Sequence, residues 1–246
     1  MSQPIIQDIC IYGREGLEAA DQAGQLRSMP TPSDIRIGSL PVAENNQSEP
    51  LDIKNIYKVF EDFVRAMGQM MEVRDPYTVY HQSRVSLICV AIARLMDLPS
   101  FKIKGLELAA LVHDIGKLAI PSEILTKPGQ LTQYEFDLIK THPKVGYDII
   151  KGIEFPWPVA KTMLQHHERM NGSGYPGGIS DQDILIEARI LGVADVIEAM
   201  SSNRPYRPAK GISLALEEIC VNKHRLYDGD VVDACLEYFA TSGYKA

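Results

Sequence analysis

The stretch of sequence that decides the fold is Leu106–Lys117, which reads LELAALVHDIGK. Its apolar side chains up to Val112 recur at helical spacing, so we expect a helix packed into the core. An imidazole and a carboxylate, His113 and Asp114, follow directly. A buried carboxylate without a partner is strongly penalised, and a metal ion would remove that penalty. A polar end to a core helix is the alternative. The stretch therefore predicts a helical domain with a candidate metal site.

The same helical period recurs outward from this stretch. Thr132 and Glu135 have capping-box spacing, and Pro143 suits the first turn of the next helix. The Gly-rich and Pro-rich residues 172–178 predict a loop. No hairpin signal interrupts the pattern, so we expect an all-α protein. The remaining helices are expected from Ile53 onward and over residues 85–96, 106–112, 159–167, 184–200, 212–221 and 231–239.

Residues 1–50 lack this period and contain two linker-like stretches, so we expect a weakly ordered N-terminal extension. The helical domain would then occupy residues 51–246. No apolar run is long enough to span a bilayer, and the N-terminus lacks the features of a signal peptide. These observations favour a cytoplasmic protein that is not inserted in a membrane.

The overall composition is that of an ordinary globular protein, with 45% hydrophobic and 23% charged residues. The net charge is −7 and there is no block of Lys and Arg, which disfavours genomic nucleic acid as a partner. The cysteines show no Cys-x-x-Cys spacing, which argues against a thiolate zinc site. We expect them to be reduced and buried. They are Cys10, Cys89, Cys220 and Cys235.

Histidine placement gives the strongest functional signal. His166 and His167 are adjacent, and successive helical residues diverge by about 100°, so both can reach one centre only at a helix end. Asp195 lies in an apolar stretch and is a second candidate buried carboxylate. A single helical histidine is more often packed or solvated, but imidazoles and carboxylates together suit iron, manganese or zinc. We expect two metal ions. The six histidines are His81, His113, His142, His166, His167 and His224.

Taken together, these residues resemble the HD-GYP domain of the HD phosphohydrolase superfamily. The resemblance is ordered and covers roughly residues 52–239. It rests on EVRDPYTVYH at 72–81, HDIGK at 113–117, HP at 142–143, HHERMNGSGYP at 166–176, Asp195, and NRPYR at 203–207.

The resemblance implies an HD-type helical bundle and a phosphodiesterase that hydrolyses cyclic di-GMP to the linear dinucleotide, and in many members onward to GMP. It implies one metal held by His81, His113, Asp114 and Asp195, and a second held by Asp114, His142, His166 and His167. A hydroxide bridging the metals would attack phosphorus. Lys117 takes the position of the catalytic lysine, one helical turn after His113.

The dinucleotide carries two phosphates, so nearby cations should hold it. Arg169, Arg204 and Arg207 are candidates, with structural salt bridges as the equal alternative. Gly174 and Tyr175 would bring backbone and an aromatic ring close to the substrate, unless they form a purely structural turn. The same loop could also bind a signalling protein.

Two positions depart from the family pattern. Asn171 stands where the family usually has Asp, and Tyr77 stands where some members have a glutamate associated with a third metal. Because of Asn171, the alternative that the protein is a catalytically weak sensor or a partner-binding module stays open. A phosphohydrolase acting on another nucleotide or cyclic dinucleotide is a further alternative. The second departure favours two metals.

Overall fold

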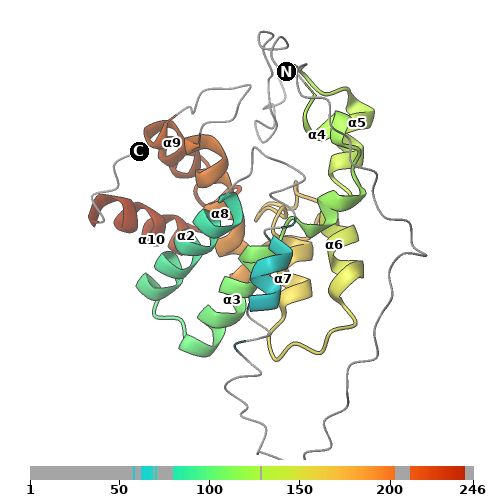
Figure 1. Ribbon diagram of the computed structural model, residues 1–246. Helices are drawn as coiled ribbons and strands as arrows, with labels where there is room; N and C mark the ends of the chain where they lie inside the picture. Colours follow the sequence, from blue (N-terminus) through green and yellow to red (C-terminus); the bar gives the residue numbers. More distant parts are fainter. Residues whose placement is uncertain are drawn as a thin grey trace, which may run out of the picture.

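The computed structural model describes residues 58, 62–68, 70, 80–127, 129–202 and 211–241 (Figure 1). Within these ranges it is helical, and its β pairing is limited to one isolated bridge between Lys223 and Tyr227. The all-α prediction is confirmed. The expected extension over residues 1–50 lies outside the described residues, and the expected boundary near residue 51 stays a prediction.

One side of the bundle is built around α2 (His81–Leu95), which packs against α3 (Ser100–Val112), α8 (Ile186–Ser201) and α10 (Gly229–Thr241). Helix α9 (Ile212–Val221) packs on α8 (Figure 1). Buried apolar residues of all five helices form one core. Cys89 and Cys235 are buried in it, as expected. Cys220 is exposed, so that expectation was wrong: its position lies on the outer face of α9.

A second, smaller core lies on the other side of α3. There α3 packs on α7 (Val159–Gln165), and α7 packs on α6 (His142–Ile150). Val64, in the helical residues 62–68, also belongs to this core. Helix α3 thus contributes to both cores, which explains why its sequence is apolar on nearly every side. Its C-terminal end lies where the two halves of the bundle meet.

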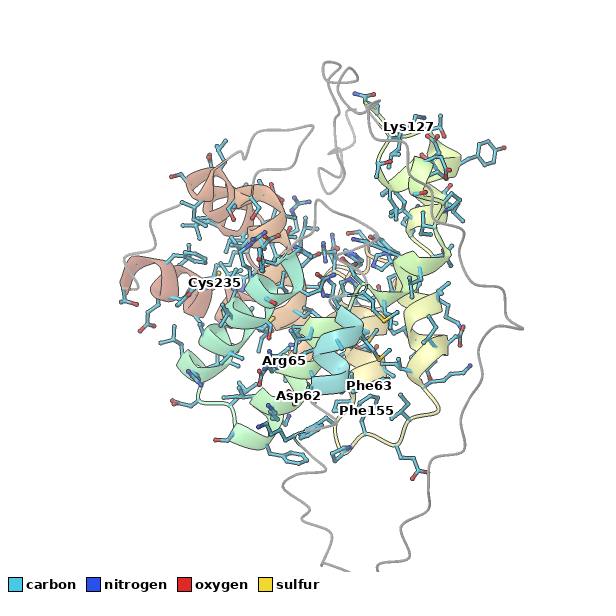
Figure 2. All side chains as sticks on the ribbon, in the orientation of Figure 1. Asp62, Phe63, Arg65, Lys127, Phe155 and Cys235 are labelled. Carbon is cyan, nitrogen blue, oxygen red and sulfur yellow. The ribbon has the colours of Figure 1, made fainter. Side chains whose placement is uncertain are left out.

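The chain between α3 and α6 forms η3 (Ile115–Ala119), α4 (Ser122–Leu125) and α5 (Gln133–Ile139). The α4–α5 segment projects from the bundle, and Lys127 lies at its outer end (Figure 2). The predicted capping box is present: Glu135 N donates to Thr132 Oγ1 at 3.3 Å, and Thr132 N donates to Glu135 Oε2 at 2.6 Å. Pro143 lies in the first turn of α6, as predicted.

Lys117 does not continue the helix that carries the apolar run. Helix α3 ends at Val112, and Lys117 lies on the short 3₁₀ helix η3. The expected α-helical turn was wrong because the chain bends sharply beside α6: a Cβ on Gly116 would lie 1.9 Å from the carbonyl oxygen of His142. The 3₁₀ turn nevertheless keeps Lys117 beside Asp114, since Lys117 N donates to Asp114 O at 2.8 Å.

The expected helix start at Ile53 lies outside the described residues. The other expected boundaries shift by up to six residues, the largest shift being at the start of α3, and α9 matches its predicted range. A second 3₁₀ helix, η4 (Asp181–Asp183), precedes α8. Among the residues placed by the structure, no helix combines the length and apolar character needed to cross a membrane.

Candidate metal centre

The candidate ligands lie mainly at the ends of helices. His81 is the first residue of α2, His113 follows the last residue of α3, and His142 is the first residue of α6. His166 caps the C-terminus of α7 and His167 comes next, so the adjacent pair does occupy a helix end as predicted. Asp195 lies within α8. Because these ends converge between the two cores, residues far apart in the chain share one centre.

The first group of donors surrounds His81. Its Nε2 lies 3.3 Å from Asp195 Oδ1 and 3.8 Å from Asp114 Oδ2. His113 Nε2 lies 3.5 Å from the same oxygen of Asp114 and 3.8 Å from the same oxygen of Asp195. Two imidazole nitrogens and two carboxylate oxygens therefore face a common point.

The second group lies on the other side of Asp114. His142 Nε2 is 3.5 Å from Asp114 Oδ1 and 3.4 Å from His166 Nε2. His142, His166 and His167 each offer a ligand atom within 4.8 Å of the others. Asp114 thus turns one oxygen to each group, which is the arrangement a bridging carboxylate requires.

Backbone carbonyls fix the orientation of three of the histidines. Each donates from Nδ1 to the carbonyl oxygen three residues earlier: His113 to Ala110 at 2.8 Å, His142 to Ile139 at 2.9 Å and His166 to Met163 at 2.6 Å. These carbonyls lie at helix ends, where they lack a full set of helical partners. With Nδ1 protonated, the lone pair is on Nε2, which faces the centre.

His81 is oriented by a carboxylate that sequence reasoning missed. Its Nδ1 forms a short hydrogen bond with Glu198 Oε2. Glu198 is buried on α8, where it also accepts from Arg84 Nε at 2.6 Å and from Ser202 Oγ at 2.6 Å. The spacing of Asp195 and Glu198 was the available signal, since residues three apart in an apolar helix share a face.

The donor set fits divalent metal ions. His113 Nε2 is buried and has no hydrogen-bond partner among the described residues. A buried nitrogen left unpaired costs about 1–3 kcal/mol, and coordination to a cation would remove that cost. Imidazole and carboxylate donors without thiolates suit iron, manganese and zinc. The cluster could therefore hold divalent metal ions.

The surroundings of the two aspartates in the centre favour their charged forms. Burial alone would raise the pKa of Asp114, but Lys117 and the surrounding histidines hold it well below its usual range. The pKa of Asp195 is likewise held well below its usual range against the effect of burial, because the imidazoles of His113 and His81 lie beside its carboxylate. Both aspartates are therefore carboxylates at neutral pH, as metal ligands must be.

The histidines split into two classes. Burial lowers the pKa of His142 to about 4 and the pKa values of His166 and His167 well below their usual range. Burial also opposes the charged form of His81, but Glu198 and Asp195 raise its pKa to about 9. The second group of donors is thus neutral near pH 7, whereas His81 carries a proton until a competing cation displaces it.

Lys117 points at the same carboxylate that joins the two groups. Its Nζ lies 2.7 Å from Asp114 Oδ2, and its side chain is 19% exposed. The Lys117 ammonium therefore lies beside the carboxylate that joins the two groups, and its side chain is partly exposed. This is where the resemblance requires a catalytic lysine.

The Gly-rich loop folds back on the end of α7. The Tyr175 ring stacks on the His167 ring with centroids 4.7 Å apart. Gly174 lies so close to the backbone that a Cβ there would be 2.4 Å from the carbonyl oxygen of His167. Arg169 is buried, donates to the carbonyl oxygens of His166 at 3.3 Å and Glu168 at 3.0 Å, and lies over the Tyr227 ring. Arg204 and Arg207 lie outside the described residues.

A model of the HD domain family matches residues 65–231. A cyclic di-GMP phosphodiesterase response regulator, RpfG, from Xanthomonas campestris is 40% identical over 69% of this chain and 46% of its own. A 3'3'-cGAMP-specific phosphodiesterase from Vibrio cholerae is 34% identical over 78% of this chain and 41% of its own. Further curated relatives are also named cyclic di-GMP phosphodiesterases.

Solved structures share the fold. An HDGYP protein, Bd1817, from Bdellovibrio bacteriovorus aligns with a TM-score of 0.57 over 76% of this chain and 64% of its own, at 18% identity. The chain spans about half the length of the curated relatives it matches. The comparisons confirm the family resemblance drawn from the motifs.

Proposed function

The chain belongs to the HD domain family, and on that premise we propose that it is a metal-dependent phosphodiesterase that hydrolyses cyclic di-GMP. One observation carries the proposal: seven imidazole and carboxylate side chains converge on one buried centre, with the Lys117 ammonium on the shared carboxylate of Asp114. The names of the relatives support the substrate class.

We assign the ligands to two ions by the neighbours that each one has in the cluster, with Asp114 shared between them. His81, His113 and Asp195 would hold the first ion together with Asp114 Oδ2. The second would be held by Asp114 Oδ1 with His142, His166 and His167. Iron or manganese is the expected pair, with zinc as the alternative. When bound, two such ions supply an activated water and neutralise charge on the phosphate.

The residues of the chain would position the ligands and stabilise the charge of the transition state. Asp114 fixes the separation of the two groups, and the backbone bonds to the histidine Nδ1 atoms hold the donors in place before substrate arrives. Lys117 would stabilise the charge that develops on the phosphate oxygens in the transition state.

Substrate contacts are proposed at the open edge of the centre. Gly174 and Tyr175 would border the bound dinucleotide, and Arg204 and Arg207, which lie outside the described residues, would help to hold its phosphates. Arg169 would contribute to the same contacts, and its guanidinium also donates to the backbone carbonyl oxygens of His166 and Glu168. The loop over residues 172–178 is also the proposed surface for a signalling partner. A cytoplasmic location, where the dinucleotide would be met, stays a prediction.

The test is a hydrolysis assay on the full chain, purified without oxygen and reloaded with iron or manganese. Cyclic di-GMP, 3'3'-cGAMP and cyclic di-AMP are offered separately, and the products are resolved by chromatography. We expect metal-dependent conversion of cyclic di-GMP to linear dinucleotide and GMP, faster than for the other two. Asp114→Ala should abolish turnover and reduce metal content while leaving a helical protein.

Other outcomes are decisive as well. Faster turnover of 3'3'-cGAMP would replace the proposed substrate with the one named for the Vibrio relatives. Bound metal and bound dinucleotide without turnover would favour a sensor. Near-wild-type turnover by Asp114→Ala would refute the two-ion assignment, because one carboxylate serves both groups.

A further inference from the structure

The histidines of the centre are not all held in the same way. His113, His142 and His166 donate from Nδ1 to backbone carbonyls, and His81 pairs with Glu198. His167 differs, because its buried Nδ1 has no hydrogen-bond partner among the residues that the structure describes. A metal ligand usually has its second nitrogen fixed by a hydrogen bond. We take His167 to offer Nε2 to the ion, as His113, His142 and His166 do, so something other than a hydrogen bond must fix its ring.

Ring packing takes that role. The His167 ring contacts His166, with centroids 4.0 Å apart, and His142, with centroids 5.0 Å apart, but both are themselves proposed ligands of the same ion. Tyr175 covers His167 from outside the ligand set, with centroids 4.7 Å apart and an angle of 26° between the ring planes. This near-parallel stack opposes rotation of the imidazole out of the position that points it at the centre.

The loop that carries Tyr175 is itself fastened to the His167 backbone. Tyr175 N donates to the carbonyl oxygen of His167 at 3.2 Å. Gly174 fits against the chain so closely that a Cβ would lie 2.5 Å from the amide nitrogen of Arg169. Further along, Gly177 N donates to the buried carboxylate of Glu168 at 2.6 Å. The ring of Tyr175 stacks on His167, and the backbone of the same loop is bound beside His167, so both fasten the loop to this one proposed metal ligand.

We propose that Tyr175 is a positioning residue for the metal ligand His167, holding its imidazole by stacking in place of a hydrogen bond. The inference rests on the proposed two-ion centre and assigns the Gly-Tyr-Pro loop a role in metal retention. The inference distinguishes a role of the Tyr175 ring from a role of its hydroxyl group. Metal retention requires the aromatic ring of Tyr175 and not its hydroxyl group, whereas a substrate contact through the phenol would require the hydroxyl.

The experiment measures metal binding and not turnover. Full-length wild type, Tyr175→Phe and Tyr175→Leu are stripped with a chelator, titrated with Mn²⁺ by calorimetry, and analysed for bound manganese after desalting. Tyr175→Phe should bind two ions as wild type does. Tyr175→Leu should bind one ion normally and the other about 10- to 100-fold more weakly, the usual cost of losing a residue that orients a ligand. Tyr134→Leu, at a tyrosine that is 89% exposed on α5, is the matched control.

Wild-type affinity for both ions in Tyr175→Leu would overturn the inference, as would loss of an ion in Tyr175→Phe. Circular dichroism checks that each variant is folded. If Tyr175→Leu does not fold, Gly174→Ala makes the same test, because its added methyl pushes the loop off the His167 backbone and should weaken the same ion. Wild type that binds two ions but hydrolyses no dinucleotide would defeat the proposed function and leave this inference standing.

Discussion

His81 and Glu198, separated by 117 positions in the chain, form a hydrogen-bonded pair that joins the start of α2 to the last turns of α8. The pair makes His81 the one candidate ligand in the described structure whose Nδ1 faces a carboxylate and not a backbone carbonyl. A carboxylate partner raises the basicity of an imidazole and so strengthens its bond to a cation. Arg84 and Ser202 hold the carboxylate in turn.

Glu198→Gln should therefore weaken the ion held by His81 while sparing the other. The amide keeps a hydrogen bond but removes the charge, and we expect the affinity to fall about 10- to 100-fold. Calorimetric titration of the metal-free protein with Mn²⁺ measures it. Glu187→Gln is the control, since Glu187 is equally buried on α8 but pairs with Lys102 at 3.6 Å. Equal affinities in the two variants would contradict the prediction.

Lys117→Met should lower the rate of the chemical step without emptying the centre. Removing one donor that stabilises transition-state charge typically costs about 100- to 1000-fold in kcat. Steady-state kinetics with metal analysis on the same sample measures both quantities. Lys127→Met serves as control, because Lys127 pairs with Glu135 at the outer end of the α4–α5 projection (Figure 2). An unchanged kcat in Lys117→Met would remove this lysine from the mechanism.

Asn171→Asp should change activity by less than about threefold, the effect usual for a surface substitution away from a special feature. Asn171 is exposed, and its Oδ1 accepts from Ser173 N at 3.1 Å and from Ser173 Oγ at 2.7 Å. A carboxylate oxygen would accept the same two bonds, so the loop keeps its shape. Comparison of kcat/KM for the two proteins measures the effect. A large gain in turnover would instead revive the interpretation of the native protein as a weak sensor.

The metal-free protein should lose stability in mild acid. The folded-state pKa of His142 is about 4, below its ordinary 6.5, so between these values the unfolded chain binds more protons. The contribution of His142 to the free energy of unfolding is therefore complete above pH 6.5 and is lost as the pH falls toward 4. His166 and His167, whose pKa values are also lowered, change the free energy of unfolding in the same direction. His81 acts oppositely: its contribution is complete below pH 6.5 and is lost as the pH rises toward 9.

Thermal unfolding of chelator-treated protein, followed by circular dichroism, tests this. The Tm should be lower at pH 5 than at pH 7, because three histidines with lowered pKa values outweigh one with a raised value. His142→Gln should flatten the acid side of the profile, since it removes one group that must stay neutral when folded. A Tm that rises on acidification would show that the histidines are not buried in neutral form.

Much of this centre could be predicted from the sequence because its ligands interrupt apolar patterns. His113 and Asp114 end a core run, and Asp195 breaks another, so each draws attention as a buried polar group. The capping box at Thr132 and Glu135 is a local signal and was correctly placed. Helical periodicity located the long helices within a few residues.

The rest depended on contacts that periodicity does not encode. The short η3 and α4 contain too few residues to show a period, so the bend that redirects Lys117 was missed. Glu198 was passed over because a glutamate in a helix is ordinarily a solvent-facing residue. The roles of Arg169 and Tyr175 depend on how the loop returns to α7, and such a return is set by packing between distant segments.

The placement of ligands at the ends of separate helices has a consequence for how the molecule opens. Any fluctuation that parts α2, α3, α6, α7 or α8 would also separate donors of a bound ion, and so would have to release it. Ion binding adds its free energy to the cost of each such opening. Amide hydrogens in these five helices would then exchange with solvent only through near-global unfolding, while the α4–α5 projection keeps a low opening free energy of its own.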